Sequence, residues 1–250
     1  VRRQRQMCIR DRGITPAMKE GSGMVNFEKE YPERFYDVAI AEQHSVTFAA
    51  GLSLEGLKPV VAIYSTFLQR GYDQFIHDVC LENIDVTFAI DRAGIVGEDG
   101  PTHTGSFDIS FMRCIPNIVI SCPSNEHELW HLLNICYEHK GPAAIRYPRG
   151  SGIGVKPIPN EIEGFEIGKA KKIKDCQSVC ILNFGVLMDQ IDQIAEKKDY
   201  TLYDMRFIKP IDQDALEHAM QHETIITLED NTLLGGCGSA VGEQLHKQKF

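Results

Sequence analysis

Residues 60–90 read VVAIYSTFLQRGYDQFIHDVCLENIDVTFAI and indicate the fold class of the chain. Two short apolar runs, Val60–Tyr64 and Val86–Ile90, stand at the ends of this stretch. Between them lies Gln69–Leu81, where apolar residues recur at i, i+3, i+4, i+7 and i+8 and predict one buried face of a helix: Tyr72, Phe75, Ile76, Val79 and Cys80. A strand, a helix and a second strand in this order predict a βαβ unit and a parallel sheet.

The same alternation continues along the chain, so we expect an α/β fold with a mostly parallel sheet. Further strands are expected at Ile118–Ile120, Val179–Leu182, Thr201–Asp204 and Ile225–Leu228. A helix is expected to begin at Ser124, whose hydroxyl can cap it, and to run to about Glu138.

Glycine and proline cluster after Pro148 and predict a linker over residues 150–174. We therefore expect one α/β domain over residues 13–149 and a second over residues 175–250, truncated at its C-terminal end. Residues 1–12 hold five arginines in an otherwise acidic chain and lack the features of a targeting peptide. We interpret them as a non-native or artefactual basic leader.

Charge and composition exclude several classes of function. The chain holds 26 Lys and Arg against 35 Asp and Glu, a formal charge of −9, so general affinity for nucleic acid or an anionic membrane is not expected. No apolar run approaches the roughly 18 residues that span a bilayer. The eight cysteines form no Cys-x-x-Cys pair, and most have apolar neighbours, which favours a reducing cytoplasm. Any anionic ligand must be held by a local group of cations.

Three local clusters carry residues suited to chemistry. Ala41–His44 places Glu42 after an apolar stretch, where a partly desolvated carboxylate can share a proton with a ligand nitrogen. A first-turn glutamate favoured by the helix dipole is the simpler alternative. Tyr64–Arg70 follows a predicted parallel strand, where two rings can face a flat heterocycle and Arg70 can hold an anion. The simpler alternative for this cluster is that both rings belong to the apolar core and that Arg70 is solvated.

The third cluster is a glycine-rich loop after the strand that ends near Ile90. It contains Arg92 and, further on, an acid/base pair made by Asp99 and His103. Turn chemistry alone explains Asp99-Gly100-Pro101, but it does not explain the nearby arginine and histidine. The histidine spacing fits no zinc motif, and no phosphate-binding P-loop is present. We assign no metal ligand within this chain.

Five stretches, in order along the chain, resemble the 1-deoxy-D-xylulose-5-phosphate synthase family of transketolase-like thiamine diphosphate enzymes: Asp37–His44, Val61–Arg70, Phe88–Gly94, Asp99–His103 and Arg146–Gly150. The second domain adds Asp204–Pro210. The resemblance implies a pyrimidine-binding domain followed by a transketolase C-terminal domain. It also implies that the N-terminal domain, which holds Mg²⁺ and the diphosphate in this family, is absent from this chain.

The resemblance implies three catalytic residues, Glu42, His103 and Asp99. Glu42 corresponds to the carboxylate that pairs with N1′ of the cofactor aminopyrimidine. Phe67 corresponds to the ring stacked on that pyrimidine, with Tyr64 beside it, so the implied cofactor-binding residues are Glu42, Phe67 and Tyr64. His103 is placed to donate a proton to a developing alkoxide, and Asp99 holds or polarises the same region.

Substrate binding is implied for the family's phosphate-binding arginines, together with two of the residues above: Arg70, Arg92, Arg149, Tyr64 and His103. Three guanidinium groups in one pocket would explain how an acidic chain holds an anion.

The implied activity is the thiamine diphosphate-dependent condensation of pyruvate with glyceraldehyde 3-phosphate to 1-deoxy-D-xylulose 5-phosphate and CO₂, the first step of the non-mevalonate isoprenoid pathway. The expected partners are the N-terminal domain of the same enzyme and a second copy in a homodimer, and we expect the fragment alone to be inactive. Three alternatives stay open: a 2-oxoacid dehydrogenase E1 β-type subunit, a transketolase fragment, and a non-catalytic α/β assembly module. The module predicts that the candidate side chains do not converge.

Overall fold

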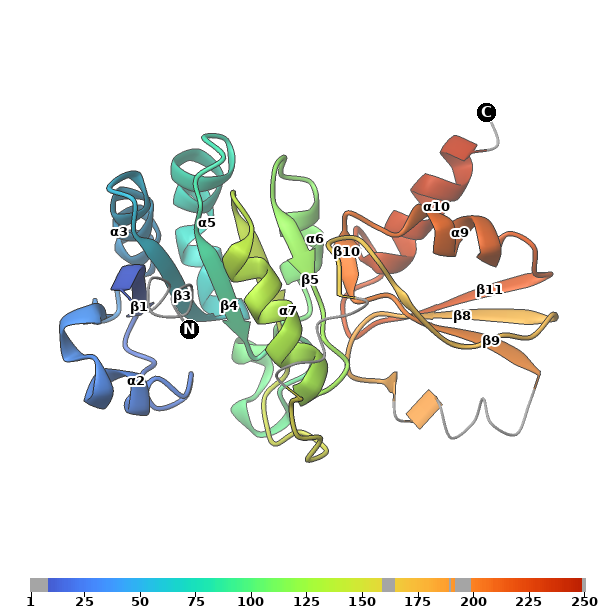
Figure 1. Cartoon of the computed structure of the whole chain (residues 1–250), viewed down its shortest axis with the longest axis horizontal. Helices are drawn as coiled ribbons and strands as arrows, with labels where there is room; N and C mark the ends of the chain where they lie inside the picture. The colour runs from blue at the N-terminus through green and yellow to red at the C-terminus, as the bar shows by residue number, and fades with distance from the viewer. Residues whose placement is uncertain (1–8, 159–164, 189, 192–198, 249–250) are drawn as a thin grey trace.

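The computed structural model describes residues 9–158, 165–188, 190–191 and 199–248. Two sheets lie one after the other along the long axis of the molecule, each with helices packed against it (Figure 1). The expected α/β class with a mostly parallel sheet is confirmed.

The first sheet has seven strands, and all of its neighbouring pairs are parallel except the pair made by β10 and β5. In spatial order the strands are β10 (Phe207–Lys209), β5 (Val119–Ser121), β6 (Ala143–Arg146), β4 (Thr87–Asp91), β3 (Lys58–Tyr64), β1 (Asp11–Thr15) and β2 (Phe35–Asp37). Strand β10 comes from the C-terminal part of the chain, so the two halves of the molecule share this sheet.

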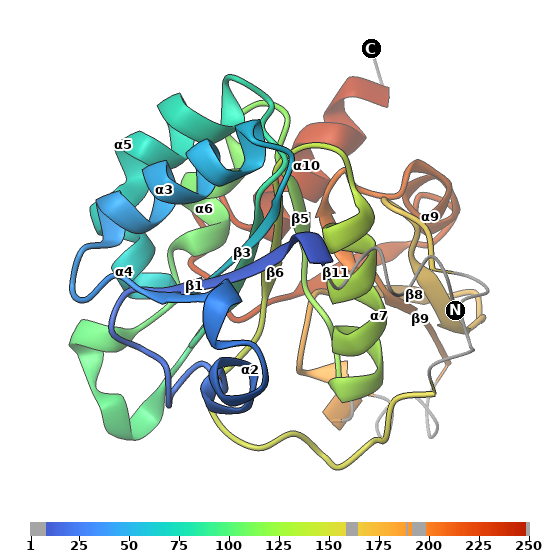
Figure 2. The ribbon, with the colours of Figure 1, turned by 60° about the vertical axis from the view of Figure 1, so that its left-hand side comes forward.

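Both faces of the first sheet are buried, because its central strands carry apolar residues at nearly every position. Val61, Ile63 and Phe88 face the side covered by α3 (Glu42–Leu54) and α6 (Asp108–Arg113), whereas Ala62 and Ala89 face α7 (Glu126–Glu138). Figure 2 shows α3, α5 and α6 on one side of the sheet and α7 on the other. The apolar run Val60–Tyr64 is thus a central strand rather than a half-exposed one.

The helix expected over Gln69–Leu81 is confirmed, although it is not a regular α-helix throughout. It consists of a 3₁₀ turn η2 (Gln69–Gly71), a single α-turn α5 (Tyr72–Gln74) and a π-helical segment η3 (Phe75–Cys80). Phe75, Val79 and Cys80 are fully buried, as the periodicity predicts. The remaining short helical segments of this half are α2 (Val25–Glu30), η1 (Pro32–Arg34), α4 (Ser65–Leu68), η4 (Gly97–Asp99) and η5 (Pro101–His103).

The second sheet has four strands, in the order β11 (Thr224–Leu228), β8 (Val179–Asn183), β9 (Tyr200–Asp204) and β7 (Lys171–Lys174). Strand β7 is antiparallel to β9, and the other pairs are parallel. Helices α9 (Gln213–Ala219) and α10 (Cys237–Gln248) contribute buried residues to the same apolar core as α3, so one core continues through both halves.

Three expectations about boundaries are wrong. Asp11 and Arg12 belong to β1 and pair with β3, so the first domain begins inside the segment assigned to the leader; residues 1–8 lie outside the described part. Strand β7 lies inside the segment assigned to the linker, so the second domain begins before residue 175. The cap of α7 is Asn125, whose side chain accepts a hydrogen bond from the backbone N–H of Glu128 at 3.0 Å. Ser124 instead donates to Asp204 at 2.6 Å.

Buried charges join the two halves where α7 meets β9. Arg206 Nε lies 2.8 Å from a carboxylate oxygen of Glu128, and both side chains are almost fully buried. Asp204 beside them accepts the Ser124 hydroxyl, and its pKa is raised to about 7 by burial and by the negative charge of Glu128.

Within the described ranges, no helix combines the length and the apolar character needed to cross a bilayer.

Asp204 predicts a pH-dependent stability. Because its folded pKa, about 7, lies above the roughly 3.9 of an unfolded aspartate, the folded chain binds the proton more tightly. The stabilisation of the folded state by this proton is fully present below about pH 4, and it is lost as the pH rises to about 7. Asp204→Asn should therefore increase the free energy of unfolding more at pH 8 than at pH 5, measured by urea denaturation.

Asp175→Asn is the matched control, because Asp175 is exposed and its pKa is lowered by the hydrogen bond from Lys172. It should give no such gain at pH 8. An equal loss of stability at both pH values in Asp204→Asn would contradict the expected sign.

Candidate active site

The candidate residues come from the carboxyl edge of the first sheet. Parallel strands in register end at one level, and here Tyr64 of β3 pairs with Asp91 of β4, while Ile90 pairs with Arg146 of β6. The segments that follow these strands carry Phe67, in helix α4, and Arg92 and Arg149, in loops. The sequence thus places the three segments beside one another, at the edge where open α/β sheets bind ligands.

Glu42 is the first residue of α3 and is 3% exposed. Arg70 Nη1 donates to Glu42 Oε1 at 3.1 Å, and the Arg70 side chain is 57% exposed. Because Glu42 stands in the first turn of α3, its carboxylate also lies where the helix dipole favours negative charge. The structure thus pairs Arg70 with the carboxylate, whereas the sequence comparison implied a substrate phosphate for this arginine.

An aromatic row runs beside this ion pair. Tyr64 and Phe67 are stacked with ring centroids 5.4 Å apart, and the imidazole of His103 meets Phe67 edge-on, also at 5.4 Å. The Arg70 guanidinium lies 5.1 Å from the Phe67 ring centre. His103 Nδ1 is 3.0 Å from the hydroxyl of Thr102, which fixes the orientation of the ring. A half-buried aromatic face therefore lies between Glu42 and His103.

Arg92 connects the aromatic row to the acidic loop. Its guanidinium lies 3.8 Å from the Tyr64 ring centre, and its Nε donates to Asp99 at 3.1 Å. Arg149 Nε lies 3.0 Å from the other Asp99 carboxylate oxygen. One carboxylate thus holds two arginines side by side, and each keeps further N–H groups for an anionic ligand.

Asp91 lies in the stretch Phe88–Gly94 quoted above, but it was assigned no role in the candidate site. It accepts both the backbone N–H of Arg92 at 2.6 Å and the Arg92 Nη1 at 2.7 Å. Arg92 has a φ of +58°, a left-handed conformation that is costly for a side chain of this size, and the two bonds stabilise it. Burial raises the pKa of Asp91, against the effect of Arg92. The signal available in the sequence was an aspartate directly after the predicted strand Val86–Ile90, and the structure makes this aspartate the last residue of β4.

Gly21 is a second residue that was missed. A Cβ at this position would overlap the Tyr64 hydroxyl, and the Gly21 carbonyl lies 3.4 Å from Arg92 Nη1. Burial also raises the pKa of the Tyr64 hydroxyl. Only glycine lets the N-terminal loop approach the aromatic row this closely.

The eight predicted site residues form one continuous series of contacts. It runs from the ion pair of Glu42 and Arg70 through the aromatic row to Arg92, Asp99 and Arg149, with Glu42 and Asp99 well separated along it. A cavity of about 720 Å³ adjoins the arginine end, lined by Arg92, Arg149, residues 150–153 and Val186 of the second domain. This convergence is the outcome that a non-catalytic module does not predict.

The residues fit one part of a thiamine cofactor. A buried carboxylate beside a half-buried aromatic face suits an aminopyrimidine, which has a ring nitrogen to protonate and a flat face to cover. Among the described residues, no group of three or more His, Cys, Asp or Glu side chains is arranged to hold a metal ion.

Two family models match the chain. The pyrimidine-binding domain of transketolase matches residues 6–153, and the transketolase C-terminal domain matches residues 168–250. The chain belongs to the transketolase family. The second match begins before β7, in agreement with the corrected domain boundary.

The chain has high sequence identity to curated proteins that share one name. It is 56% identical over 237 residues to the 1-deoxy-D-xylulose-5-phosphate synthase of Idiomarina loihiensis, covering 94% of this chain and 38% of the relative. It is 59% identical over 232 residues to the protein of the same name from Francisella tularensis subsp. novicida, covering 92% and 37%. The chain thus spans less than two fifths of the length of these relatives.

Solved structures agree with the transketolase fold. A split-gene transketolase, described as an inactive β4 tetramer, has a TM-score of 0.84 and 27% identity, and covers 98% of this chain and 82% of that one. The transketolase of Campylobacter jejuni has a TM-score of 0.72 at 15% identity, and covers 95% and 44%, which supports the fold alone.

The ion pair between Glu42 and Arg70 predicts a measurable coupling. In the wild type, the substitution Arg70→Met leaves the buried Glu42 carboxylate without its charged partner and lowers the free energy of unfolding. The same substitution in Glu42→Gln leaves no unpaired charge, so it should lower the free energy of unfolding less. A double-mutant cycle of Glu42→Gln and Arg70→Met in urea denaturation should give a coupling of about 1–2 kcal/mol.

The exposed pair of Lys172 and Asp175, which lie 2.5 Å apart, is the reference for that cycle and should couple by less than about 1 kcal/mol. A Glu42–Arg70 coupling no larger than this would show that the contact is not formed in solution.

Proposed function

We propose that this chain supplies the pyrimidine-binding and C-terminal parts of a 1-deoxy-D-xylulose-5-phosphate synthase. This enzyme would condense pyruvate with glyceraldehyde 3-phosphate to 1-deoxy-D-xylulose 5-phosphate and CO₂, the first step of non-mevalonate isoprenoid synthesis. The single observation that carries the proposal is the continuous series of contacts from Glu42 to Arg149, which combines a buried carboxylate, an aromatic face and two arginines held by one aspartate. The names of the relatives at 56–59% identity point to the same reaction.

Glu42 and Phe67 are the proposed contacts to the cofactor pyrimidine. When bound, thiamine diphosphate supplies the carbon nucleophile and the electron sink of the reaction. Glu42 holds a proton at N1′, and its burial keeps water from competing for that proton. Phe67 covers the face of the ring, and Tyr64 supports Phe67 from its other side.

The arginines are the proposed site for the aldehyde substrate, which carries a phosphate. Arg92 and Arg149 form the edge of the cavity, and Asp99 fixes both of them before the substrate arrives. His103, in contact with Phe67, donates a proton to the alkoxide oxygen that forms as the new carbon–carbon bond closes. We also propose Arg70 as a further phosphate contact. In that case Arg70 must release its hydrogen bond to Glu42 when it binds the substrate phosphate.

The remaining parts of the site are proposed to lie outside this chain. Mg²⁺ and the diphosphate would be held by the N-terminal domain of the same enzyme, and two copies would assemble as a homodimer. The described cysteines are free, and five of the seven are buried, which suits the reducing cytoplasm that we propose as its location.

Reconstitution tests the proposed function. This chain is mixed with the separately produced N-terminal segment of the Idiomarina loihiensis relative, thiamine diphosphate, Mg²⁺, pyruvate and glyceraldehyde 3-phosphate. We expect 1-deoxy-D-xylulose 5-phosphate to form, and Glu42→Gln to lower its rate by about 100-fold or more, the usual contribution of a positioned proton-transfer group.

The control is Glu55→Gln, at the exposed C-terminal end of the same helix, which should retain full activity. If the two segments bind each other and no product forms, the synthase proposal fails. If the mixture without glyceraldehyde 3-phosphate releases CO₂ from pyruvate and reduces an added two-electron acceptor, the dehydrogenase subunit is favoured.

Loss of Arg149 should affect the KM values of the two substrates differently. In the reconstituted enzyme, Arg149→Met should raise the KM for glyceraldehyde 3-phosphate by about 10-fold or more, because a charged hydrogen bond is worth about 1.5–3 kcal/mol. The KM for pyruvate, which has no phosphate, should change less than about threefold. A parallel rise in both constants would place Arg149 outside the phosphate site.

A further inference from the structure

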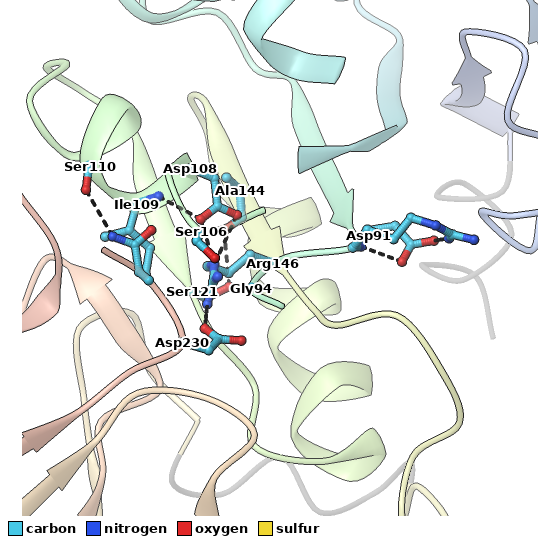
Figure 3. Close-up of polar contacts among 12 residues, drawn as sticks. Asp91, Gly94, Ser106, Asp108, Ile109, Ser110, Ser121, Ala144, Arg146 and Asp230 are labelled. Carbon is cyan, nitrogen blue, oxygen red and sulfur yellow. Dashed lines mark hydrogen bonds and ion pairs between the residues drawn. The ribbon is translucent and has the colours of Figure 1, made fainter. Parts of the chain in front are cut away.

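A segment of the second domain lies along the loop that carries Asp99 and His103. The backbone N–H of Thr232 donates to Ser106 O at 2.8 Å, and the Ser110 hydroxyl donates to Leu234 O at 2.7 Å. Asn231 Nδ2 donates to the same hydroxyl at 2.9 Å. These bonds place residues 231–234, which follow β11, directly against residues 106–110 of the first domain. Figure 3 shows Ser106, Ser110 and Asp230 in this region.

The centre of this contact is a buried arginine. Figure 3 shows Arg146 between Asp108 and Asp230: its Nε lies 3.1 Å from both carboxylate oxygens of Asp108, and its Nη1 donates to Asp230 at 2.7 Å. Arg146 is 3% exposed and Asp108 is fully buried. Burial disfavours the charge of Arg146, but the two carboxylates outweigh it, so the pKa of the guanidinium is raised. A buried cation of this kind is stable only while both of its partners are present.

Each partner of Arg146 belongs to a different part of the site. Arg146 ends β6, three residues before Arg149. Asp108 begins α6 directly after the loop with Asp99 and His103. Asp230 is the contribution of the second domain, so one guanidinium connects three segments that are far apart in the sequence.

The Asp230 carboxylate also packs on the loop itself. A Cβ at Gly94 would overlap Asp230 Oδ2, and Gly94 has a φ of +75°. Gly94 and Gly105 exchange two backbone hydrogen bonds, of 3.0 and 2.8 Å, which close the base of the loop. The second domain therefore covers the point at which residues 94–105 are closed.

We propose that Asp230 is a positioning residue through which the second domain holds the 94–105 loop in its closed form and so places Asp99 and His103. The effect on the loop follows from the contacts above, whereas the effect on catalysis rests on the proposed function. The role assigned here to the second domain goes beyond structural support and assembly.

Hydrogen exchange tests the loop directly, without activity. In the 250-residue chain, Asp230→Asn keeps the side-chain volume and removes the charge that Arg146 requires. We expect the backbone N–H groups of Gly94 and Gly105 to exchange about tenfold faster or more, as expected for local opening of a weakened segment, and the His103 ring signals to shift in the NMR spectrum.

Glu243→Gln is the matched control, because Glu243 also bridges the two domains, through Arg113 at 2.6 and 2.8 Å, but does not touch the loop. It should leave the exchange of Gly94 and Gly105 and the His103 signals unchanged. Equal effects of the two variants, or no effect of Asp230→Asn, would overturn the proposal.

A second variant covers the case in which Asp230→Asn does not fold. Ser110→Ala removes the hydroxyl that contacts Asn231 and Leu234 but leaves the buried charges intact. It should accelerate exchange at Gly105 in the same direction by a smaller factor, and no acceleration in a folded Ser110→Ala would also overturn the proposal.

In the reconstituted enzyme, Asp230→Asn should lower kcat by about tenfold, equivalent to about 1.4 kcal/mol, and change the KM for pyruvate little. If hydrogen exchange becomes faster but kcat does not change, Asp230 holds the loop closed but does not contribute to catalysis, and that part of the proposal fails. A reconstituted wild type without activity would count against the proposed function alone.

Discussion

The in-register pairing of β3, β4 and β6 is the constraint on which the site depends. Because these three parallel strands end at one level, the loops that leave them must share one edge of the sheet. The central strands are buried on both faces, so a slip in register would break apolar contacts on two sides at once. The aromatic row and the arginine pair therefore owe their common location to strand pairing as well as to the contacts among the site residues.

Local arrangement, not overall charge, determines how this acidic chain presents cations. Asp91 and Asp99 each accept hydrogen bonds from Arg92, and Asp99 also contacts Arg149. The acidic residues near the cavity thus orient the arginines rather than neutralising every donor, since a guanidinium has five N–H groups. Carboxylates that appear unfavourable for anion binding in a residue count thus hold the two arginines that we propose as the phosphate contacts.

Local apolar patterns predicted β3, β4, β5 and the buried helix face. Seven of the eight candidate site residues lie in the three local clusters of the sequence, whereas Arg149 and the roles of all eight came from the family resemblance and stay predictions. Strands β1, β6, β7 and β10 were not predicted. Strand β7 is mostly lysine and exposed, as suits a sheet edge, and β10 has three residues, too few to show a period. The Arg146 cluster was not predicted because its three members come from distant segments, and only the packing of the two domains brings them together.

Strand β10 limits how this molecule can be divided. It lies after the linker in sequence but completes the first sheet beside β5. A chimera that joins the first domain of one homologue to the second domain of another would therefore exchange the edge strand of a sheet as well as a neighbouring domain. The stability of such a chimera would depend on the backbone pairing of Phe207–Lys209 with Val119–Ser121 as well as on the contacts between the domains.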